Sequence, residues 1–85
     1  MKHAGHEALE TLAPLLAKLR KHADLREKTT GCFYFKSKAF LHFHEDPAGM
    51  FADVKLGADF VRLRVSTKTE QRTLLDRVDQ FLEAR

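Results

Sequence analysis

The chain is poor in the residues that cross-link, interrupt or anchor a protein. Its 85 residues include one cysteine, Cys32, no tryptophan, two prolines and four glycines. A single cysteine excludes an intramolecular disulfide and a cysteine-rich zinc site. No apolar run approaches the ~20 residues that a membrane helix needs, and the opening MKHAGHEALE lacks the apolar core of a signal peptide. We therefore expect a cytoplasmic protein that does not enter membranes.

Motifs typical of enzymes are missing as well. The sequence has no nucleophile elbow, no glycine-rich phosphate loop, and no cysteine–histidine arrangement with an evident orienting group. Cys32 alone does not indicate catalysis, because an isolated cysteine is usually unreactive. The sequence therefore predicts a protein that is not an enzyme and that needs no cofactor.

The residues that are present suit one compact domain. Hydrophobic residues make up 44% of the chain, with seven phenylalanines, and charged residues of both signs make up 32%. A chain of this size buries only about 60% of its unfolded surface, so we expect residues 1–85 to form a single domain around one core. The net charge of +3 is compatible with an anionic partner without indicating one.

The first amphipathic segment is ALETLAPLLAKLRKH, residues 8–22. Its leucines recur at helical spacing, as Leu9, Leu12, Leu16 and Leu19. A proline in the middle of a helix costs about 3 kcal/mol. We therefore expect the regular helix to begin near Thr11 as its N-cap, with Pro14 in the first turn. Residues 1–10 would then be a flexible or kinked extension.

From residue 32 onward, apolar and polar residues alternate, as in half-buried strands. The alternating segments are residues 32–36, 39–45, 50–56 and 60–66. Turn signals separate them, at 36–38, at Asp46-Pro47-Ala48-Gly49 and at Gly57-Ala58, the last as a two-residue hairpin loop. We expect four strands in an antiparallel meander, with residues 24–30 as an extended lead-in.

The final segment predicts a second amphipathic helix. Thr67 and Glu70 have the spacing of a capping box. The apolar stripe that follows consists of Leu74, Leu75, Val78, Phe81 and Leu82. Two such helices and a half-buried sheet are best accommodated with both helices on the same face. The sequence thus predicts a two-layer α+β fold in the order α-β-β-β-β-α, with a four-stranded antiparallel meander.

The three turns together predict which side chains face away from the helices. Pairing across the turns matches apolar residues on one side of the sheet: Phe33 with Leu41, Leu41 with Val54, Phe43 with Ala52, and Val54 with Val61. The outward side would then carry three rows: Cys32, His42, Asp53 and Arg62; His44, Phe51 and Arg64; and Tyr34, Phe40, Lys55 and Phe60. Within the first row we expect an ion pair between Asp53 and Arg62.

This outward side is the candidate interaction surface. Its residues of interest are Tyr34, Phe40, His42, His44, Phe51, Phe60, Arg62 and Arg64. Exposed Phe40, Phe51 and Phe60 would form an apolar patch that monomers seldom leave open, which favours association with a protein partner, in the first place as a homodimer. The alternative is binding of single-stranded nucleic acid or DNA, because rings stack on bases and cations follow phosphates.

A metal site is a further reading of the same face. His42 and His44 are two residues apart on one strand face, with Asp53 across from them, the composition of a two-histidine, one-carboxylate site. However, Arg62 would compete for Asp53, and any solvated strand face alternates in the same way. We therefore predict no metal site, and His42, His44 and Asp53 are the residues that would form one.

Residues 33–56, FYFKSKAFLHFHEDPAGMFADVKL, precede the capped helix. This arrangement resembles the middle of the small bacterial YjbR-type family, in which a strand, a turn with a Gly-Lys-x-Phe character and a second strand lead into a hairpin. The matching residues are Lys38 and Phe40, with Ser37 where the family often has glycine. The resemblance implies an α+β fold and a DNA-binding role, and it transfers no functional residue.

Overall fold

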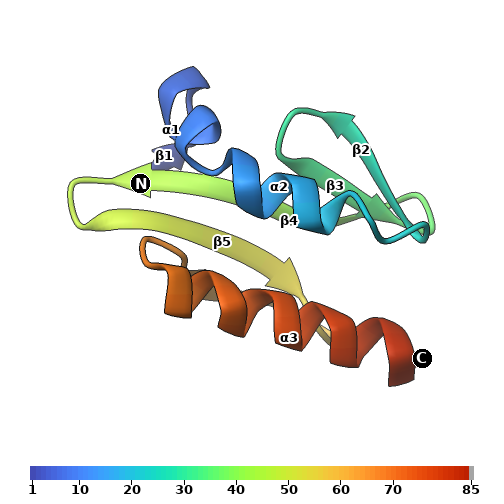
Figure 1. Cartoon of the computed structure of the whole chain (residues 1–85). Helices are drawn as coiled ribbons and strands as arrows, with labels where there is room; N and C mark the ends of the chain where they lie inside the picture. Colours follow the sequence, from blue (N-terminus) through green and yellow to red (C-terminus); the bar gives the residue numbers. More distant parts are fainter. Residues whose placement is uncertain (85) are drawn as a thin grey trace.

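The computed structural model describes residues 1–84, which form three helices and six strands. In chain order these are β1 (Lys2–His3), α1 (His6–Thr11), α2 (Ala13–Leu19), β2 (Leu25–Thr29), β3 (Cys32–Phe35), β4 (Lys38–Asp46), β5 (Gly49–Lys55), β6 (Phe60–Arg64) and α3 (Lys68–Ala84). The strands form one antiparallel sheet in the order β2-β3-β4-β5-β6, and β1 pairs with β4. Helices α2 and α3 both lie over one face of the sheet (Figure 1).

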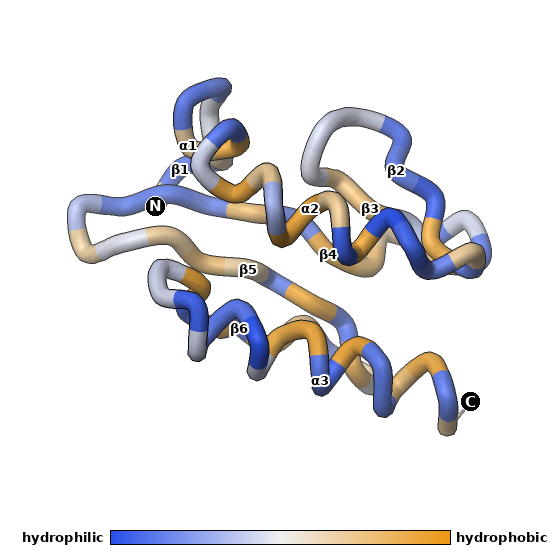
Figure 2. The backbone as a smooth tube through the Cα atoms, in the orientation of Figure 1, coloured by the Kyte–Doolittle hydropathy of each residue, from blue (hydrophilic) through white to orange (hydrophobic). Residues whose placement is uncertain are grey.

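The core lies between this face and the two helices. Inward side chains of β3, β4 and β5 meet the leucines of α2 and the apolar stripe of α3 in a single buried cluster. Figure 2 shows hydrophobic and hydrophilic positions alternating along α2 and α3, as helices with one face on a core require. The predicted α+β fold, with both helices on one face, is confirmed.

The sheet is wider than the four strands expected. Residues 24–30, expected as a lead-in, contain β2, which pairs antiparallel with β3. Strand β1 adds two residues beside β4, with Lys2 opposite Glu45 and His3 opposite His44. The sequences of β1 and β2 are short and mainly polar, so they carry no strand pattern of their own. The expected strand number is therefore wrong, although the order of the meander is right.

The first helical segment is divided in two. Leu12 is both the C-cap of α1 and the N-cap of α2, and Pro14 lies in the first turn of α2, where its missing N–H is not needed. Thr11 is the last residue of α1, and its hydroxyl donates a hydrogen bond to the Glu7 carbonyl at 3.1 Å. The N-cap of α2 therefore lies one residue later than expected, at Leu12. Residues 1–10 contain β1 and most of α1.

The predicted register is confirmed in the centre of the sheet. The pairs present there include Leu41 with Val54, Phe43 with Ala52, and Val54 with Val61. The loop between β5 and β6 is longer than the two residues expected, because the last ladder pair is Lys55 with Phe60 and residues 56–59 lie between them. The longer loop leaves the pairing of the strands unchanged.

Strand β4 departs from the predicted phase at Phe40. Phe33 of β3 lies opposite Leu41, but the next residue of β3, Tyr34, lies opposite Ala39. Phe40 is therefore the extra residue of a β-bulge, in which two residues of one strand oppose one residue of its neighbour. On the N-terminal side of the bulge, Phe40 and Ala39 therefore take the sides opposite to those expected, whereas the residues from Leu41 onward keep the predicted phase.

The bulge buries the Phe40 ring in the core. Its centroid lies 6.0 Å from that of Phe35 and 5.5 Å from that of Phe81 on α3, and the residue is only 2% exposed. Burial of a phenylalanine contributes roughly 1.5–3 kcal/mol, more than the ~0.5–1.5 kcal/mol of one hydrogen bond lost from the ladder. The expected outward position of Phe40 is therefore wrong, and Ala39 faces outward opposite Tyr34.

Helix α3 begins as predicted. The Glu70 N–H donates to the Thr67 hydroxyl at 3.1 Å, and the Thr67 N–H donates to the Glu70 carboxylate at 3.0 Å. These are the two bonds of a capping box. The same carboxylate accepts a bond from the Ser66 N–H at 3.0 Å. Together the three bonds hold the turn that leads from β6 back over the core.

Glu27 connects α2, β2 and the turn before β3. Its carboxylate accepts hydrogen bonds from the Arg20 guanidinium, with Nη2 at 3.0 Å, and from the Gly31 N–H at 2.8 Å. Gly31 has a φ of 79°, a left-handed conformation that favours glycine. The bond from Arg20 is the main cause that holds the pKa of Glu27 below its ordinary value, and it outweighs the opposing effect of burial.

Replacement of Phe40 tests its inward position. Phe40→Ala should lower the free energy of unfolding by about 3–5 kcal/mol, because it removes a buried ring and leaves a cavity. Phe60→Ala should change it by only about 0.5 kcal/mol, since Phe60 is 41% exposed. Urea denaturation of both variants measures the difference, and equal effects would contradict the bulge.

Glu27→Gln should destabilise the protein near neutral pH and have little effect in acid. A carboxyl whose pKa is lowered by folding stabilises the native state above its unfolded pKa, and this contribution is lost as the pH falls through the folded pKa. The difference in unfolding free energy between wild type and variant should therefore shrink between about pH 7 and about pH 3. Glu83→Gln, at an exposed position of α3, is the control and should show no such trend.

Candidate functional site

The side of the sheet away from the helices is open. We call it the open face, and no described helix covers it (Figure 1). Its outward side chains belong to His3, Arg26, Lys28, Cys32, Tyr34, Ala39, His42, His44, Asp46, Phe51, Asp53, Lys55, Phe60, Arg62 and Arg64. Successive side chains of a strand point to opposite faces. Since Ala52 and Val54 of β5 are buried, Phe51, Asp53 and Lys55 point outward.

Four rings form a continuous row on the open face. His3 stacks on His44 with centroids 4.7 Å apart and lies 5.9 Å from His42. His42 in turn contacts His44 at 5.0 Å and Phe60 at 5.4 Å, both edge to face. Strand β1 brings His3 to this row by pairing with the end of β4. The row therefore joins three strands that are distant in the sequence.

Beside the row the face is hollowed. A depression of about 190 Å³, which we call the Tyr34 hollow, is lined on this face by His3, Cys32, Tyr34, Ala39 and His42. The bulge accounts for it, because the small Ala39 and not Phe40 faces outward next to Tyr34. The Lys28 ammonium stands over the Tyr34 ring, 4.3 Å from its centroid. The rings of Tyr34 and His42 thus line the hollow, and the Lys28 ammonium contacts the Tyr34 ring.

Asp53 is held in the middle of the face by Arg62. The guanidinium donates Nε to Oδ1 at 2.7 Å and Nη2 to Oδ2 at 2.8 Å, which confirms the predicted ion pair as a bidentate one. These hydrogen bonds are the main cause that holds the pKa of Asp53 below its ordinary value, against its partial burial. Asp53 therefore remains ionised at neutral pH.

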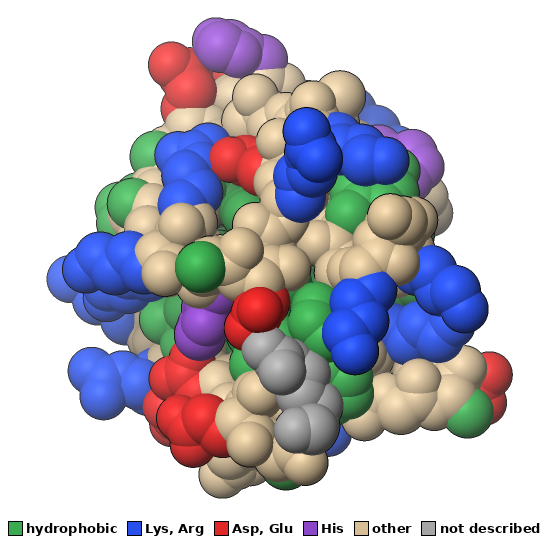
Figure 3. All heavy atoms as spheres, turned by 90° about the vertical axis from the view of Figure 1, so that its right-hand side faces the viewer, with side chains coloured by type: hydrophobic (Ala, Val, Ile, Leu, Met, Phe, Trp, Pro, Cys, Tyr) green, Lys and Arg blue, Asp and Glu red, His purple; other side chains and the backbone are tan. Residues whose placement is uncertain are grey.

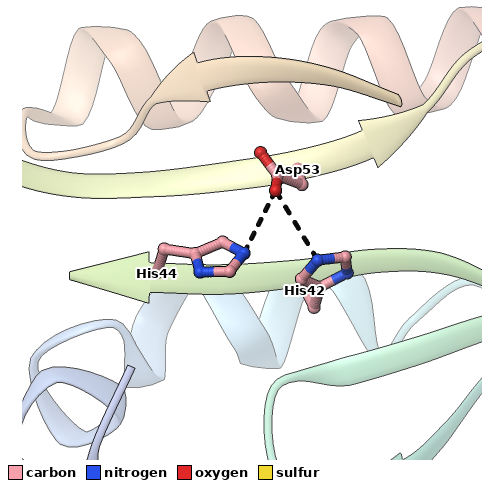
Figure 4. Close-up of side chains that lie close together, drawn as sticks. All are labelled: His42, His44 and Asp53. Carbon is pink, nitrogen blue, oxygen red and sulfur yellow. Dashed lines mark ion pairs between the residues drawn. The ribbon is translucent and has the colours of Figure 1, made fainter. Parts of the chain in front are cut away.

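Two imidazoles face this carboxylate (Figure 4). His44 Nε2 lies 3.1 Å from Asp53 Oδ2, and His42 Nε2 lies 3.6 Å from the same oxygen. Burial lowers the pKa of His42, and the attraction of Asp53 only partly offsets this effect. The neutral form of His42 is therefore favoured at neutral pH.

His44 is buried although it lies on the outward side. It is 9% exposed, because the His3 ring covers it. Neither of its ring nitrogens makes a hydrogen bond in the part of the chain described, since the ring is not aligned for one with the nearby Asp53. The expectation for His44 is therefore right about the side of the sheet and wrong about exposure to solvent.

Arg64 and Phe51 contribute less to the face than expected. The Arg64 guanidinium turns toward α3 and the β4–β5 turn, where it donates to the Glu70 carboxylate at 3.3 Å and to the Ala48 carbonyl at 3.1 Å. Phe51 lies opposite Arg64 and is only half-exposed. Arg64 thus ties the edge strand to its neighbours.

Basic side chains outnumber acidic ones on the open face. The basic residues are Arg26, Lys28, Lys55, Arg62 and Arg64. Among the paired strand positions that the structure describes, the outward acidic residues are Asp53, which is bonded to Arg62, and Asp46, whose carboxylate accepts the Ala48 N–H at the β4–β5 turn. With Arg62 paired to Asp53 and Arg64 paired to Glu70, the remaining cations Arg26, Lys28 and Lys55 still give the face an excess of positive charge.

Most of the residues expected on this surface are found there, and the exception is Phe40. The structure also adds His3, Lys28 and Ala39, which the sequence pattern did not indicate. His3 and Lys28 lie in or beside strands that were not expected, and Ala39 faces outward because of the bulge. The glycine before Cys32, in the turn at Thr30-Gly31, is a signal from which the β2–β3 hairpin could have been found.

No known family model, curated protein or solved structure matches this chain. The resemblance to the YjbR-type family therefore remains a prediction. In the described part of the chain, none of the helices has the length and apolar character required to cross a bilayer. What the protein binds is consequently inferred from the geometry of the open face.

Proposed function

We propose that the protein binds single-stranded nucleic acid on its open face and catalyses no reaction there. Accessible rings, an excess of cations and a hollow beside Tyr34 support this role. The Tyr34 hollow carries the proposal, because a base placed in it would lie beside the Tyr34 ring and near the Lys28 ammonium that contacts this ring. Binding of this kind is compatible with the cytoplasmic location that the sequence predicts.

The residues that line the hollow suit stacking. Tyr34 and His42 stand at its sides, and Ala39 keeps the space between them open. Every base has a π-face, so stacking on such rings tolerates many sequences. Phe60, whose ring lies 5.4 Å from that of His42, offers a further ring for the next base.

Cations continue past the hollow around the end of the sheet. A second depression of about 300 Å³ shares Ala39 with the Tyr34 hollow and is lined in part by Lys36, Lys38 and Lys55. Lys55 also lies 6.0 Å from the centre of the Phe60 ring. A phosphate backbone that leaves the Tyr34 hollow would therefore remain among cations, which supply most of the affinity for nucleic acid.

The same charges disfavour a homodimer through the open face. A two-fold symmetric dimer places one surface against its own copy, so the cations of the face would meet one another, and like charges at an interface weaken association. In addition, the inward position of Phe40 reduces the apolar patch that favoured a dimer. Among the described residues of the face, Phe60 is the large apolar side chain that remains exposed, at 41%.

Titration of a labelled single-stranded oligonucleotide, followed by fluorescence anisotropy, tests this role. Affinity should fall with salt, with a log–log slope of about −2 if three phosphates are neutralised. Tyr34→Ala should weaken binding by about 5- to 150-fold, which corresponds to the ~1–3 kcal/mol of one stacked base. Tyr34→Phe keeps the ring and should bind like the wild type.

A matched pair of lysines provides the control. Lys and Arg side chains also project around the end of the molecule at which α3 finishes (Figure 3), so general attraction must be separated from binding at the face. Lys28→Ala should weaken binding more than Lys21→Ala, since Lys21 lies on the side of the helices. Equal losses for the two lysines, or full affinity of Tyr34→Ala, would contradict the proposal.

The edge strand β6 favours homodimerisation as a second role, through the edge of the sheet and not through its face. β6 ends the sheet and pairs with β5 on one side, and its neighbouring residues Phe60 and Val61 are 41% and 37% exposed. An unpaired edge with exposed apolar side chains is a template for a strand of another chain. Two copies joined at β6 would leave both open faces accessible.

Sedimentation at several protein concentrations tests the edge dimer. Wild-type protein should dimerise as its concentration rises, whereas Val61→Lys should stay monomeric, because a lysine on an edge strand opposes pairing with another chain. Lys21→Ala, away from the edge, should dimerise normally. A wild-type protein that remains monomeric at the highest concentration reached would rule out this role.

A further inference from the structure

We propose that His42, His44 and Asp53 bind a zinc ion, with His3 as the fourth ligand. The three side chains converge on one point of the open face (Figure 4). This inference rests on the donor atoms of the cluster and does not require nucleic-acid binding, although His3 and His42 also line the Tyr34 hollow.

The distances within the cluster suit a tetrahedral ion. His44 Nε2 and His42 Nε2 lie 3.1 Å and 3.6 Å from Asp53 Oδ2. With zinc–ligand bonds of about 2.0–2.1 Å, neighbouring ligand atoms in a tetrahedral site are about 3.3–3.4 Å apart. The donor atoms of His42, His44 and Asp53 lie within 4.8 Å of one another.

The His44 ring provides an independent reason to place a ligand here. His44 is 9% exposed, its Nδ1 has no hydrogen-bond partner among the described groups, and its Nε2 lies 3.1 Å from Asp53 Oδ2 without the geometry of a hydrogen bond. Buried polar atoms in proteins nearly always have a partner, and neutral imidazole is the commonest metal ligand. An ion between His44 and Asp53 would bond to the nitrogen that faces the carboxylate.

Arg62 leaves room for the ion on Asp53. Its two hydrogen bonds use one position on each carboxylate oxygen, and an ionised carboxylate has about four such positions. Oδ2 therefore keeps a lone pair for the ion. Carboxylate ligands of metals are usually hydrogen-bonded to an outer partner, which orients them. The charge of Arg62 weakens binding of a cation, so we expect micromolar affinity.

His3 is placed to complete the coordination. Its ring centroid lies 4.7 Å from that of His44 and 5.9 Å from that of His42, and its strand is held by only two ladder pairs. Zinc prefers four ligands from imidazole, thiolate and carboxylate groups, so a His3 ring turned out of the stack would fill the fourth position. The ion would then tie β1 to β4. Magnesium, which prefers oxygen ligands, should not bind.

Calorimetric titration of tag-free protein with zinc chloride tests the site. The wild type should bind one equivalent near pH 7.5, where imidazoles are neutral, and magnesium chloride should give no binding heat. His42→Ala should weaken zinc binding at least about tenfold, and His3→Ala should weaken it less. His22→Ala, which removes a histidine paired with Asp79 on the side of the helices, should bind zinc like the wild type.

Cobalt provides a second readout that reports coordination directly. Co²⁺ in a tetrahedral site has visible absorption bands, and these should be lost in Asp53→Asn and His44→Gln, with circular dichroism as the check that each variant is folded. Unchanged zinc affinity of the folded His42→Ala variant would overturn the proposal, as would loss of binding in His22→Ala. Neither experiment contains an oligonucleotide, so failure here leaves nucleic-acid binding unaffected.

Discussion

The bulge at Phe40 is the constraint on which both faces of the sheet depend. Strand β4 lies in the middle of the sheet, and its side chains point to both the core and the open face. Its extra residue allows the Phe40 ring to join Phe35 and Phe81 in the core, and the same residue turns Ala39 outward beside Tyr34. Burial of the ring outweighs the hydrogen bond lost from the ladder. One irregularity thus completes the core on one side and shapes the hollow on the other.

The middle of the open face is organised by one carboxylate. Asp53 accepts two hydrogen bonds from Arg62 and faces the imidazoles of His42 and His44. On a face with an excess of cations, an ionised carboxylate reduces the repulsion among them. His44 Nε2 lies 3.1 Å from this carboxylate, whereas the buried Nδ1 has no hydrogen-bond partner among the described groups, and an unsatisfied polar group costs roughly 1–3 kcal/mol.

The proposed nucleic acid and the proposed zinc ion would contact the same histidine rings. His3 and His42 belong to the lining of the Tyr34 hollow and also to the histidine cluster. An ion in the cluster would fix the orientation of these two rings and would add positive charge beside the hollow. We therefore expect each ligand to raise the affinity for the other, because the first ligand to bind would already have ordered the rings and the second would lose less conformational entropy.

Local pattern in the sequence by itself determined the register of β4, β5 and β6 and the start of α3. A period of two with one apolar side allows a single phase of burial, and Thr67 and Glu70 are close enough in the chain to form their capping box without help. Only the tertiary structure decided the side taken by Phe40, the pairing of the short polar strands β1 and β2, and the burial of His44. Each of these depends on a distant group, such as Phe81 for Phe40 and His3 for His44, and contacts between distant segments leave no periodic signal in the sequence.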